Sequence, residues 1–535
     1  MTPRLRRLRR VGFVAAVAAL LSMTFAKPAE AAYAQIEGSG STWSEVIVQQ
    51  WIADVNANGM KVTYNGGGSS QGRKAFGQYV TDFGITEIPY QGKDEYGNAD
   101  SANGREFAYM PIIAGGTAFS YQIRVGGKLV KNLRLSGDTL SKIFTNKITN
   151  WNDAAITKDN NGRALPSLKI VPVVRSDGSG TTAQFTRWMD AQYPSVWRSF
   201  FGKSGLTSYY PRKGSAIAAA GSDQVMNTIS GAAGNGTIGY VEYSYPVNKK
   251  YPVVKLLNKG GYFVEPTQYN VAVALTKAKI NQDKTSQNYL TQILDGVYNA
   301  TDPRAYPMSS YSYMLLPTGT DAQDRRMSTS KRQTLADFMF YSLCEGQTKA
   351  GGYGYSPLPL NLVQAGFEQL KKLKTADGKV DVAGRDVTKC NNPTFVAGDL
   401  SKNKLAQIAP APAACDKVGA GPCSGGTGAA PTTVGEAKQS AGTAAAAGAA
   451  TAAAGAAAGG SAPEAAVDPV TGEALAAGGD ATLAGNAQAV PMELTSSRPG
   501  DTRVFGTVAA LELLAIVLIP GVVTAYLRRR RGAGA

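Results

Sequence analysis

The chain has 535 residues, a net charge of +16 and no histidine. The missing histidine excludes Ser-His-Asp and Cys-His catalysis and histidine-ligated metal sites. The first 31 residues hold +5 of the charge and the last eight hold +4, so the remaining +7 is only mildly basic. That surplus can attract an anionic ligand but lacks a dense Lys/Arg stripe, so no nucleic-acid partner is expected.

Residues 1–31 have the pattern of an export signal. Five arginines precede an apolar run at 11–26, and the small residues around Ala29-Glu30-Ala31 suit a cleavage site. The Arg9-Arg10 pair leaves both the twin-arginine route and the general secretory route open.

Helices and short strands alternate through residues 32–400. In chain order we expect a helix at 43–55, a strand at 61–64, a helix ending near 79, strands at 107–114 and 119–123 separated by Gly115-Gly116, a helix at 140–144, a strand at 168–174, a helix at 183–189, a strand at 238–241, and helices at 335–343 and 362–373. This alternation predicts α/β domains with mostly parallel sheets. The length exceeds one comfortable core, so two lobes are expected.

A Gly/Ser-rich run at residues 175–182, Arg-Ser-Asp-Gly-Ser-Gly-Thr-Thr, connects an expected strand to an expected helix. The first turn of a helix presents unpaired N–H groups and the positive end of its dipole, which favour an anion. Serine and threonine hydroxyls add donors, and Arg175 adds a charged fork that suits an oxyanion. The run predicts an anion site, with an ordinary capped turn as the alternative.

Two earlier junctions repeat this chemistry, with Gly-Ser-Gly-Ser-Thr-Trp at 38–43 and Gly-Gly-Gly-Ser-Ser-Gln-Gly at 66–72. Each alone also fits a flexible entry to a capped helix. Three such junctions in one folded unit favour several helix N-termini that meet at one small anion. The chain lacks the Gly-x-x-x-x-Gly-Lys-Ser/Thr pattern, which disfavours an NTPase.

Four cysteines follow the export signal and favour disulfides: Cys344, Cys390, Cys415 and Cys423. Three pairings are possible, and proximity in the chain favours Cys344–Cys390 and Cys415–Cys423. A metal site built from all four thiolates is the alternative, although no Cys-x-x-Cys spacing supports it. No cofactor is expected.

The C-terminal part of the chain does not have the composition of a globular domain. Residues 401–503 are expected to form a low-complexity tether, because alanine and glycine dominate most of it and few large apolar residues are present. Residues 504–527 are almost wholly apolar and long enough to span a bilayer, and the arginines in the tail at 528–535 favour a cytoplasmic end. A cell-wall sorting signal is the alternative, but its Leu-Pro-x-Thr-Gly motif is absent.

The chain resembles the phosphate-binding receptors of high-affinity phosphate ABC transporters (the PstS family), which are periplasmic-type solute-binding proteins. The likeness covers roughly residues 35–375 and rests on motifs in the family's order, at 38–43, 68–72, 82–89, 140–151, 175–181 and 238–243. It implies a two-lobed, hinged α/β fold of the type II periplasmic-binding-protein kind. Lobe I would comprise residues 32–114 and 267–400 and lobe II residues 115–266, with crossings near Ala114 and Pro266.

The resemblance also implies that phosphate binds in the cleft between the lobes. The implied ligand-binding residues are Thr42, Trp43, Ser69 and Glu87 from lobe I, and Arg175, Ser179, Gly180 and Thr181 from lobe II. Asp177 would orient Arg175. Trp43 stands where the family commonly has phenylalanine, which is harmless if that contact uses the backbone N–H.

Glu87 departs from the family, whose cleft carboxylate is an aspartate. A carboxylate accepts a hydrogen bond from protonated phosphate, whereas sulfate has no proton to donate and would leave two acceptors facing each other in a dry cleft. Glutamate can make the same bond, although its extra methylene displaces the carboxylate. Another small oxyanion therefore stays open as the ligand.

We expect a monomeric binding protein, not an enzyme, that receives inorganic phosphate outside the cytoplasm, is anchored in the cell membrane by residues 504–527, and delivers phosphate to ABC permease subunits. A membrane-tethered surface sensor or adhesion protein with the same fold is an alternative. A phosphoryl hydrolase with Ser69 or Ser179 as nucleophile is disfavoured, because no histidine base and no obvious carboxylate metal cluster accompany them.

Overall fold

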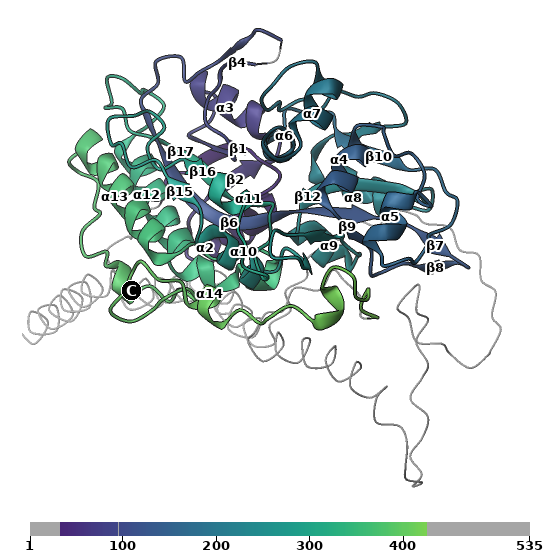
Figure 1. Ribbon diagram of the computed structural model, residues 1–535. Helices are drawn as coiled ribbons and strands as arrows, with labels where there is room; N and C mark the ends of the chain where they lie inside the picture. The colour runs from purple at the N-terminus through teal and green to yellow at the C-terminus, as the bar shows by residue number, and fades with distance from the viewer. Residues whose placement is uncertain (1–32, 95, 425–535) are drawn as a thin grey trace, which may run out of the picture. The chain divides into compact units, whose positions relative to one another are not determined.

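The computed structural model describes residues 33–94 and 96–424 (Figure 1). Helices and strands alternate along this part of the chain, as predicted. In these two ranges no helix is both long and apolar enough to cross a bilayer. The expected export signal at 1–31 and the expected membrane span at 504–527 lie outside the described residues.

Eight strands form one mixed sheet. In sheet order they are β11 (Ile217–Ala219), β10 (Val171–Arg175), β12 (Thr237–Glu242), β6 (Phe107–Tyr121), β17 (Ser309–Pro317), β3 (Phe83–Thr86), β1 (Ile36–Gly40) and β2 (Val62–Asn65). The β11–β10–β12 and β3–β1–β2 pairings are parallel, but both neighbours of β6 and the β17–β3 pair are antiparallel. The sheet is therefore less parallel than predicted.

The long strand β6 joins the two halves of this sheet. Its residues 107–116 pair with β17 and residues 117–121 pair with β12. The prediction of two strands separated by Gly115-Gly116 is wrong, because both glycines lie inside β6. A Cβ on Gly115 would lie 2.7 Å from the Trp43 ring, and one on Gly116 would lie 2.5 Å from Pro266. The glycines therefore allow close packing against the strand rather than breaking it.

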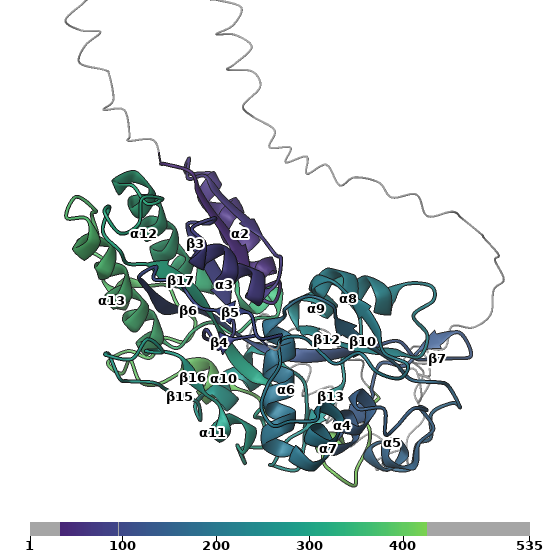
Figure 2. The same cartoon turned by 90° about the horizontal axis from the view of Figure 1, so that it is seen from above.

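Helices cover the two halves of the sheet separately, as Figure 2 shows. We call the side with β17, β3, β1 and β2 lobe I, and the side with β12, β10 and β11 lobe II. Lobe I carries α2 (Glu45–Asn56), α3 (Ser69–Gly77), α10 (Gln268–Leu275), α11 (Asp295–Tyr298), α12 (Thr329–Leu343) and α13 (Leu360–Ala376). Lobe II carries α4 (Gly137–Phe144), α5 (Ala154–Asp159), α6 (Gly180–Gln192), α7 (Pro194–Phe201), α8 (Gly221–Ser230) and α9 (Ser244–Lys249).

Short elements complete the fold. The small sheets are β14 (Phe263–Val264) with β13 (Lys255–Leu257) and β9 (Arg134–Leu135), β15 (Lys279–Ile280) with β16 (Gln292–Ile293), β4 (Gly92–Lys93) with β5 (Ala99–Asp100), and β7 (Arg124–Val125) with β8 (Lys128–Leu129). The remaining helical turns are α14 (Lys404–Ile408), η1 (Glu345–Lys349), η2 (Gly351–Tyr353), η3 (Val387–Lys389) and η4 (Ala414–Asp416).

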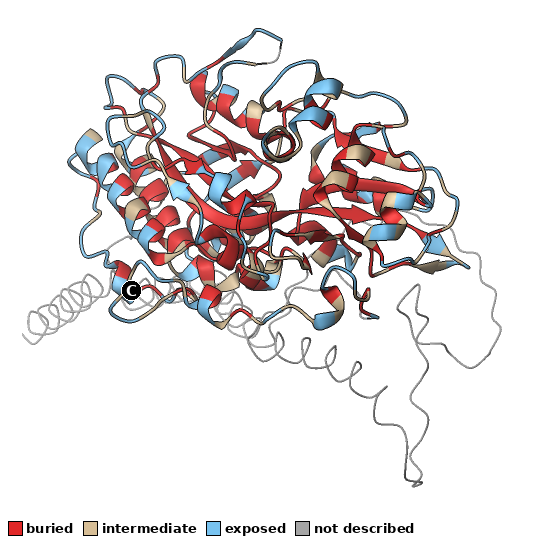
Figure 3. Ribbon diagram, in the orientation of Figure 1, coloured by how far each residue is buried: buried red, intermediate tan, exposed pale blue. Residues whose placement is uncertain are grey.

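An aromatic cluster fixes α6 against the sheet of lobe II. The Phe185 ring of α6 lies 5.0 Å, centroid to centroid, from both Phe119 of β6 and Phe144 of α4, and 5.3 Å from Tyr240 of β12. All four rings are buried, and Figure 3 shows burial concentrated along the sheet. Since Phe185 is close to the start of α6, this packing holds the helix N-terminus in one place.

The disulfides have the predicted pairing, Cys344–Cys390 and Cys415–Cys423. The first connects the end of α12 to the segment after η3, and the second closes a short loop around η4. Because every described cysteine is paired, the four-thiolate metal site is wrong.

Residues 401–424 do not belong to a tether, contrary to the predicted boundary. Helix α14 packs on α10 of lobe I, where Arg304 donates to the carbonyl oxygens of Ala406 and Ala409 at 3.3 and 3.1 Å. The chain then reaches lobe II, where Asp416 pairs with Lys255 at 2.8 Å. This C-terminal strap, residues 401–424, is ordered by polar contacts that its alanine-rich composition did not indicate.

Arg134 is the main contact between lobe II and the strap. Its guanidinium is buried, lies over the Phe263 ring and donates to the carbonyl oxygens of Asp159, Cys415 and Ala420. We expect Arg134→Ala to lower the free energy of unfolding by roughly 3 kcal/mol, because three partly buried carbonyl oxygens lose their donor. Thermal or urea unfolding measures this. The matched control is Arg124→Ala, whose exposed side chain donates to the Gly127 carbonyl oxygen. Equal losses in both variants would contradict the strap's role.

Candidate functional site

Four helix N-termini meet where lobe I faces lobe II. Helices α2 and α3 follow the parallel strands β1 and β2, and α6 and α8 follow the parallel strands β10 and β11. Within each half of the sheet the carboxyl ends of the parallel strands lie at one edge, so the helices that follow them begin at that edge. The three antiparallel pairings between β3 and β12 make the two halves run in opposite directions, and the carboxyl ends of β1 and β2 therefore face those of β10 and β11. Sequence reasoning found three of these junctions. It missed the fourth, between β11 and α8.

Ser69 and Glu87 form the centre of the site. Ser69, the first residue of α3, donates to Glu87 Oε2 at 2.6 Å and accepts the backbone N–H of Gly180 at 3.1 Å. Gly180 is the first residue of α6, so this one hydroxyl joins the two lobes. A Cβ on Gly180 would lie 2.0 Å from Glu87 Oε2 and 2.5 Å from Ser69 Oγ. Only glycine allows α6 to approach this closely.

Arg175 ends β10 and is only 2% exposed. Asp177 pairs with its guanidinium through Nε, at 2.7 Å, and through Nη2. Nη1 donates to Ser222 Oγ at 3.3 Å, and that oxygen lies 3.0 Å from Thr42 Oγ1. The Ser222 N–H also donates to Thr42 Oγ1, at 3.2 Å. Arg175 of lobe II is therefore linked to Thr42 of lobe I through Ser222.

The other expected site residues lie in the same region but differ in their contacts. Ser179 Oγ accepts the Thr182 N–H at 3.1 Å and so caps α6. The Thr181 hydroxyl is buried and has no hydrogen-bond partner among the described residues. The Trp43 N–H donates to Ser41 Oγ at 2.9 Å. Within the described residues, the Thr181 hydroxyl and the Trp43 indole N–H are therefore unused donors, whereas Ser179 and the Trp43 backbone already have partners.

The helix expected at 43–55 starts two residues later than predicted, so Trp43 is not part of it. Helix α2 starts at Glu45, and the loop between β1 and α2 carries Thr42 and Trp43. The Trp43 ring is fully buried and packs edge-on against Tyr355, with ring centroids 5.8 Å apart. The ring thus anchors the loop that presents Thr42.

Burial controls the charge of both carboxylates at the site. Burial raises the pKa of Glu87 above its usual range, while hydrogen bonds from Ser41, Ser69 and Ser312 and the positive charge of Arg175 oppose that rise. Burial also acts to raise the pKa of Asp177, but the Arg175 guanidinium and the Gly221 N–H lower it overall. Asp177 is therefore held as an anion beside Arg175, and Glu87 is easier to protonate than an ordinary glutamate.

Sequence reasoning missed two polar residues of this cluster, Ser222 and Ser312. The run Ala220-Gly221-Ser222 between β11 and α8 is a small-residue strand-to-helix junction and was a usable signal, although β11 is only three residues long. Ser312 lies inside β17 and donates to Glu87 Oε1 at 2.9 Å. No local pattern marks it, because only the pairing of distant strands brings it to Glu87.

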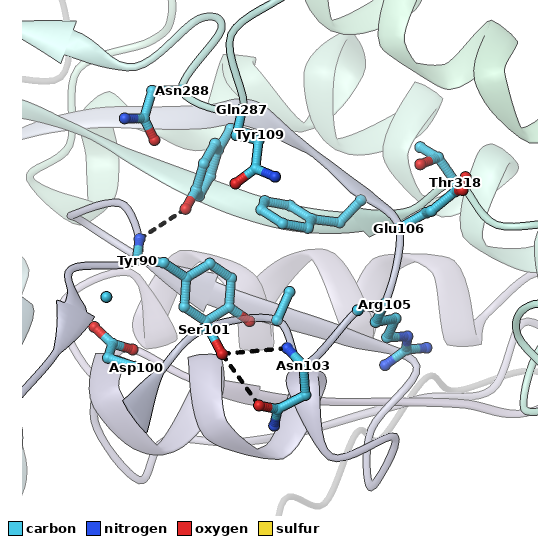
Figure 4. A pocket seen from close by; sticks show the side chains of 14 residues that line it. Tyr90, Asp100, Ser101, Asn103, Arg105, Glu106, Tyr109, Gln287, Asn288 and Thr318 are labelled. Carbon is cyan, nitrogen blue, oxygen red and sulfur yellow. Dashed lines mark hydrogen bonds between the residues drawn. The ribbon is translucent and has the colours of Figure 1, made fainter. Parts of the chain in front are cut away.

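A separate pocket of about 600 Å³ lies on lobe I beside the β4–β5 hairpin (Figure 4). Several of its polar side chains have structural partners. Tyr109 accepts the Tyr90 N–H at 2.7 Å, and Asp100 pairs with Arg73 at 2.9 Å. None of the residues lining the pocket belongs to the polar cluster around Glu87 and Arg175.

The family model described as the PBP superfamily domain matches residues 26–345, which is more than half of the chain. The chain belongs to the PBP superfamily. It is 32% identical over 349 residues to the phosphate-binding protein PstS of Methanocaldococcus jannaschii, covering 63% of this chain and 86% of that one. It is 31% identical over 335 residues to PstS of Xylella fastidiosa strain Temecula1, covering 62% and 83%. These matches confirm the PstS-like resemblance and the α/β binding-protein fold.

Among solved structures, the ancestral soluble variant of the human phosphate-binding protein aligns with 62% of this PBP-superfamily chain and 93% of its own. That alignment has a TM-score of 0.48 and 20% identity. The family assignment rests on the family model and the two PstS relatives.

Gly180→Ala tests the close approach of α6 to α3. The new methyl group would clash with both Glu87 and Ser69. We therefore expect the free energy of unfolding of the variant to be about 1–3 kcal/mol lower than that of the parent. Chemical denaturation measures this. Gly378→Ala is the control, since a Cβ at Gly378 meets no atom within 4 Å. A Gly180 variant as stable as the Gly378 variant would contradict the tight contact.

Proposed function

We propose that this PBP-superfamily chain is the extracytoplasmic substrate-binding component of a phosphate ABC transporter, and that it binds inorganic phosphate between lobes I and II. The observation that carries the proposal is the enclosed polar cluster at the four helix N-termini. Thr42, Ser69, Glu87, Arg175 and Thr181 are each at most 4% exposed. A concentration of hydroxyls and a guanidinium this deeply buried is costly unless it serves a polar ligand.

The chemistry of the cluster suits a small tetrahedral oxyanion. Hydroxyl and amide donors come from different directions, the helix dipoles favour negative charge, and Arg175 supplies a planar pair of donors. In this proposal Thr42, Trp43 and Ser69 bind the anion from lobe I, and Arg175, Ser179, Gly180 and Thr181 bind it from lobe II. Asp177 keeps the guanidinium oriented through its two hydrogen bonds.

Glu87 gives the proposed site its preference for a protonated oxyanion. An ionised carboxylate in a dry site accepts a hydrogen bond from a phosphate O–H, whereas sulfate offers only acceptors. Arsenate resembles phosphate in carrying such protons. The site should therefore favour phosphate and arsenate over sulfate whenever Glu87 is ionised.

We assign the lobe boundaries as residues 32–114 and 267–400 for lobe I and 115–266 for lobe II. The change of partner within β6 supports one crossing, and the packing of Gly116 against Pro266 supports the second crossing beside it. Hinged closure about these two crossings brings donors from both lobes onto one ligand, so the ligand stabilises the closed state.

The relatives named PstS are phosphate-binding proteins, and by analogy the partners we propose are ABC permease subunits. The protein would act outside the cytoplasm after export directed by residues 1–31. In the proposal, residues 504–527 anchor it in the membrane, and the chain after the C-terminal strap serves as the tether.

Arg175→Ala tests the ligand site. The variant loses a charge-assisted, two-pronged donor, so we expect phosphate affinity to fall by about 100-fold or more in calorimetric titration. Arg175→Lys keeps the charge without the fork and should recover only part of the affinity. Arg198→Ala is the control, because Arg198 is exposed and pairs with Asp190 on the surface of lobe II. Unchanged phosphate affinity of Arg175→Ala would contradict the assignment of this cluster as the phosphate site.

Competition among oxyanions tests the ligand class. We expect arsenate to displace bound phosphate, and sulfate to be a poor competitor at neutral pH. Equilibrium dialysis with labelled phosphate measures both. Stronger binding of sulfate than of phosphate would instead favour a receptor for another oxyanion.

A further inference from the structure

The Glu87 carboxylate receives hydrogen bonds on both of its oxygens from lobe I alone. Ser69 donates to Oε2 at 2.6 Å, and Ser312 of β17 donates to Oε1 at 2.9 Å. Both serines are fully buried. Ser312 is distant from the Gly/Ser junctions in the chain, and it is not among the proposed ligand-binding residues.

Ser44 is a second hydroxyl behind Ser312. It occupies the N-cap position of α2, yet its side chain makes no capping hydrogen bond. Its Oγ instead lies 3.3 Å from Ser312 Oγ. A helix whose N-cap serine makes no capping hydrogen bond is less stable. The orientation of the Ser44 side chain therefore serves another contact.

The direction of the protons follows from the chemistry of the groups. A hydroxyl has one proton, and an ionised carboxylate can only accept. Ser312 Oγ is placed to donate to Glu87 Oε1 at 2.9 Å and to Ser44 Oγ at 3.3 Å, and its single proton favours the shorter contact with the charged acceptor. Ser44 is therefore the competing acceptor, and the bond from Ser312 to Glu87 favours the ionised carboxylate.

We propose that Ser312 is a positioning residue that keeps the longer Glu87 side chain ionised and its carboxylate correctly oriented, and thereby sets the preference for protonated oxyanions. This inference rests on the proposed function. It explains how a glutamate serves where the family has an aspartate. Ser69 and Ser312 each donate to one of the two oxygens, which fixes a side chain that has one more rotatable bond than aspartate.

Other charged and titratable groups around Glu87 do not replace this role. Arg175 of β10 favours the ionised carboxylate but lies in lobe II, so its position depends on closure. Tyr64 of β2 donates its hydroxyl to the Ser41 carbonyl at 2.8 Å, and burial raises its pKa well above the usual value, so it stays neutral. Within lobe I, Ser69 donates to Glu87 Oε2 and Ser312 donates to Oε1, and a hydrogen bond from Ser41 also lowers the pKa of Glu87.

Sulfate binding should depend on the charge of Glu87 and therefore on pH. A protonated Glu87 can donate to sulfate, so sulfate should begin to bind as the pH falls through the pKa of Glu87. Removing a donor to the ionised form raises that pKa, and sulfate binding should then begin at higher pH. A general loss of packing would instead weaken phosphate and sulfate binding together, with no shift along the pH axis.

The test is calorimetric titration of Ser312→Ala with phosphate and with sulfate from about pH 5 to about pH 8. We expect selectivity for phosphate over sulfate at neutral pH to fall about tenfold, and the onset of sulfate binding to rise by about one pH unit. Ser44→Ala removes the competing acceptor of the Ser312 proton, so it should shift both by a smaller amount in the opposite direction, and it carries the test if Ser312→Ala does not fold.

Ser310→Ala is the matched control. Ser310 is a buried serine on the same strand, and its hydroxyl has no hydrogen-bond partner among the described residues. It should leave selectivity and the pH of onset unchanged. An equal shift in Ser310→Ala, or no shift in Ser312→Ala and Ser44→Ala while the parent binds phosphate selectively, would overturn the inference alone. A parent protein that binds no phosphate would instead overturn the proposed function.

Discussion

The structure depends on how it keeps a guanidinium and a carboxylate buried in one cluster. Arg175 and Glu87 are 2% and 1% exposed, and an isolated ion in such surroundings is strongly disfavoured. Each therefore has dedicated hydrogen-bond partners. Asp177 and Ser222 contact the guanidinium, while Ser69 and Ser312 contact the carboxylate. These partners come from strands and helices of both lobes, so the site exists only when those elements are together.

Strand β6 makes that arrangement possible. It belongs to both halves of the sheet, so it joins the half that contains β1 and β2 to the half that contains β10 and β11. Its pairing passes from β17 to β12 after Gly116. The glycines at this place serve packing as well, since Trp43 and Pro266 occupy the space that side chains would fill.

The C-terminal strap adds a third connection between the lobes. It contacts α10 in lobe I and Arg134 and Lys255 in lobe II, and a disulfide closes its final loop. Any change in the angle between the lobes must therefore be accommodated by the strap as well as by β6. The described part of the strap ends beside lobe II, where Asn132 donates to the Cys423 carbonyl oxygen at 2.9 Å.

The sequence alone determined the local features of this protein. Glycine and serine junctions, apolar periodicity and cysteine spacing depend on neighbouring residues, so they predicted the α/β alternation, three of the four helix starts, both disulfides and the candidate Arg175. The candidates Thr42, Ser69 and Glu87 came from the resemblance to the PstS family. Only the tertiary structure decided the continuous β6, the ordered strap, and the places of Ser222 and Ser312. Each of these depends on contacts between residues far apart in the chain, and no local pattern encodes which distant strand or carbonyl a side chain will meet.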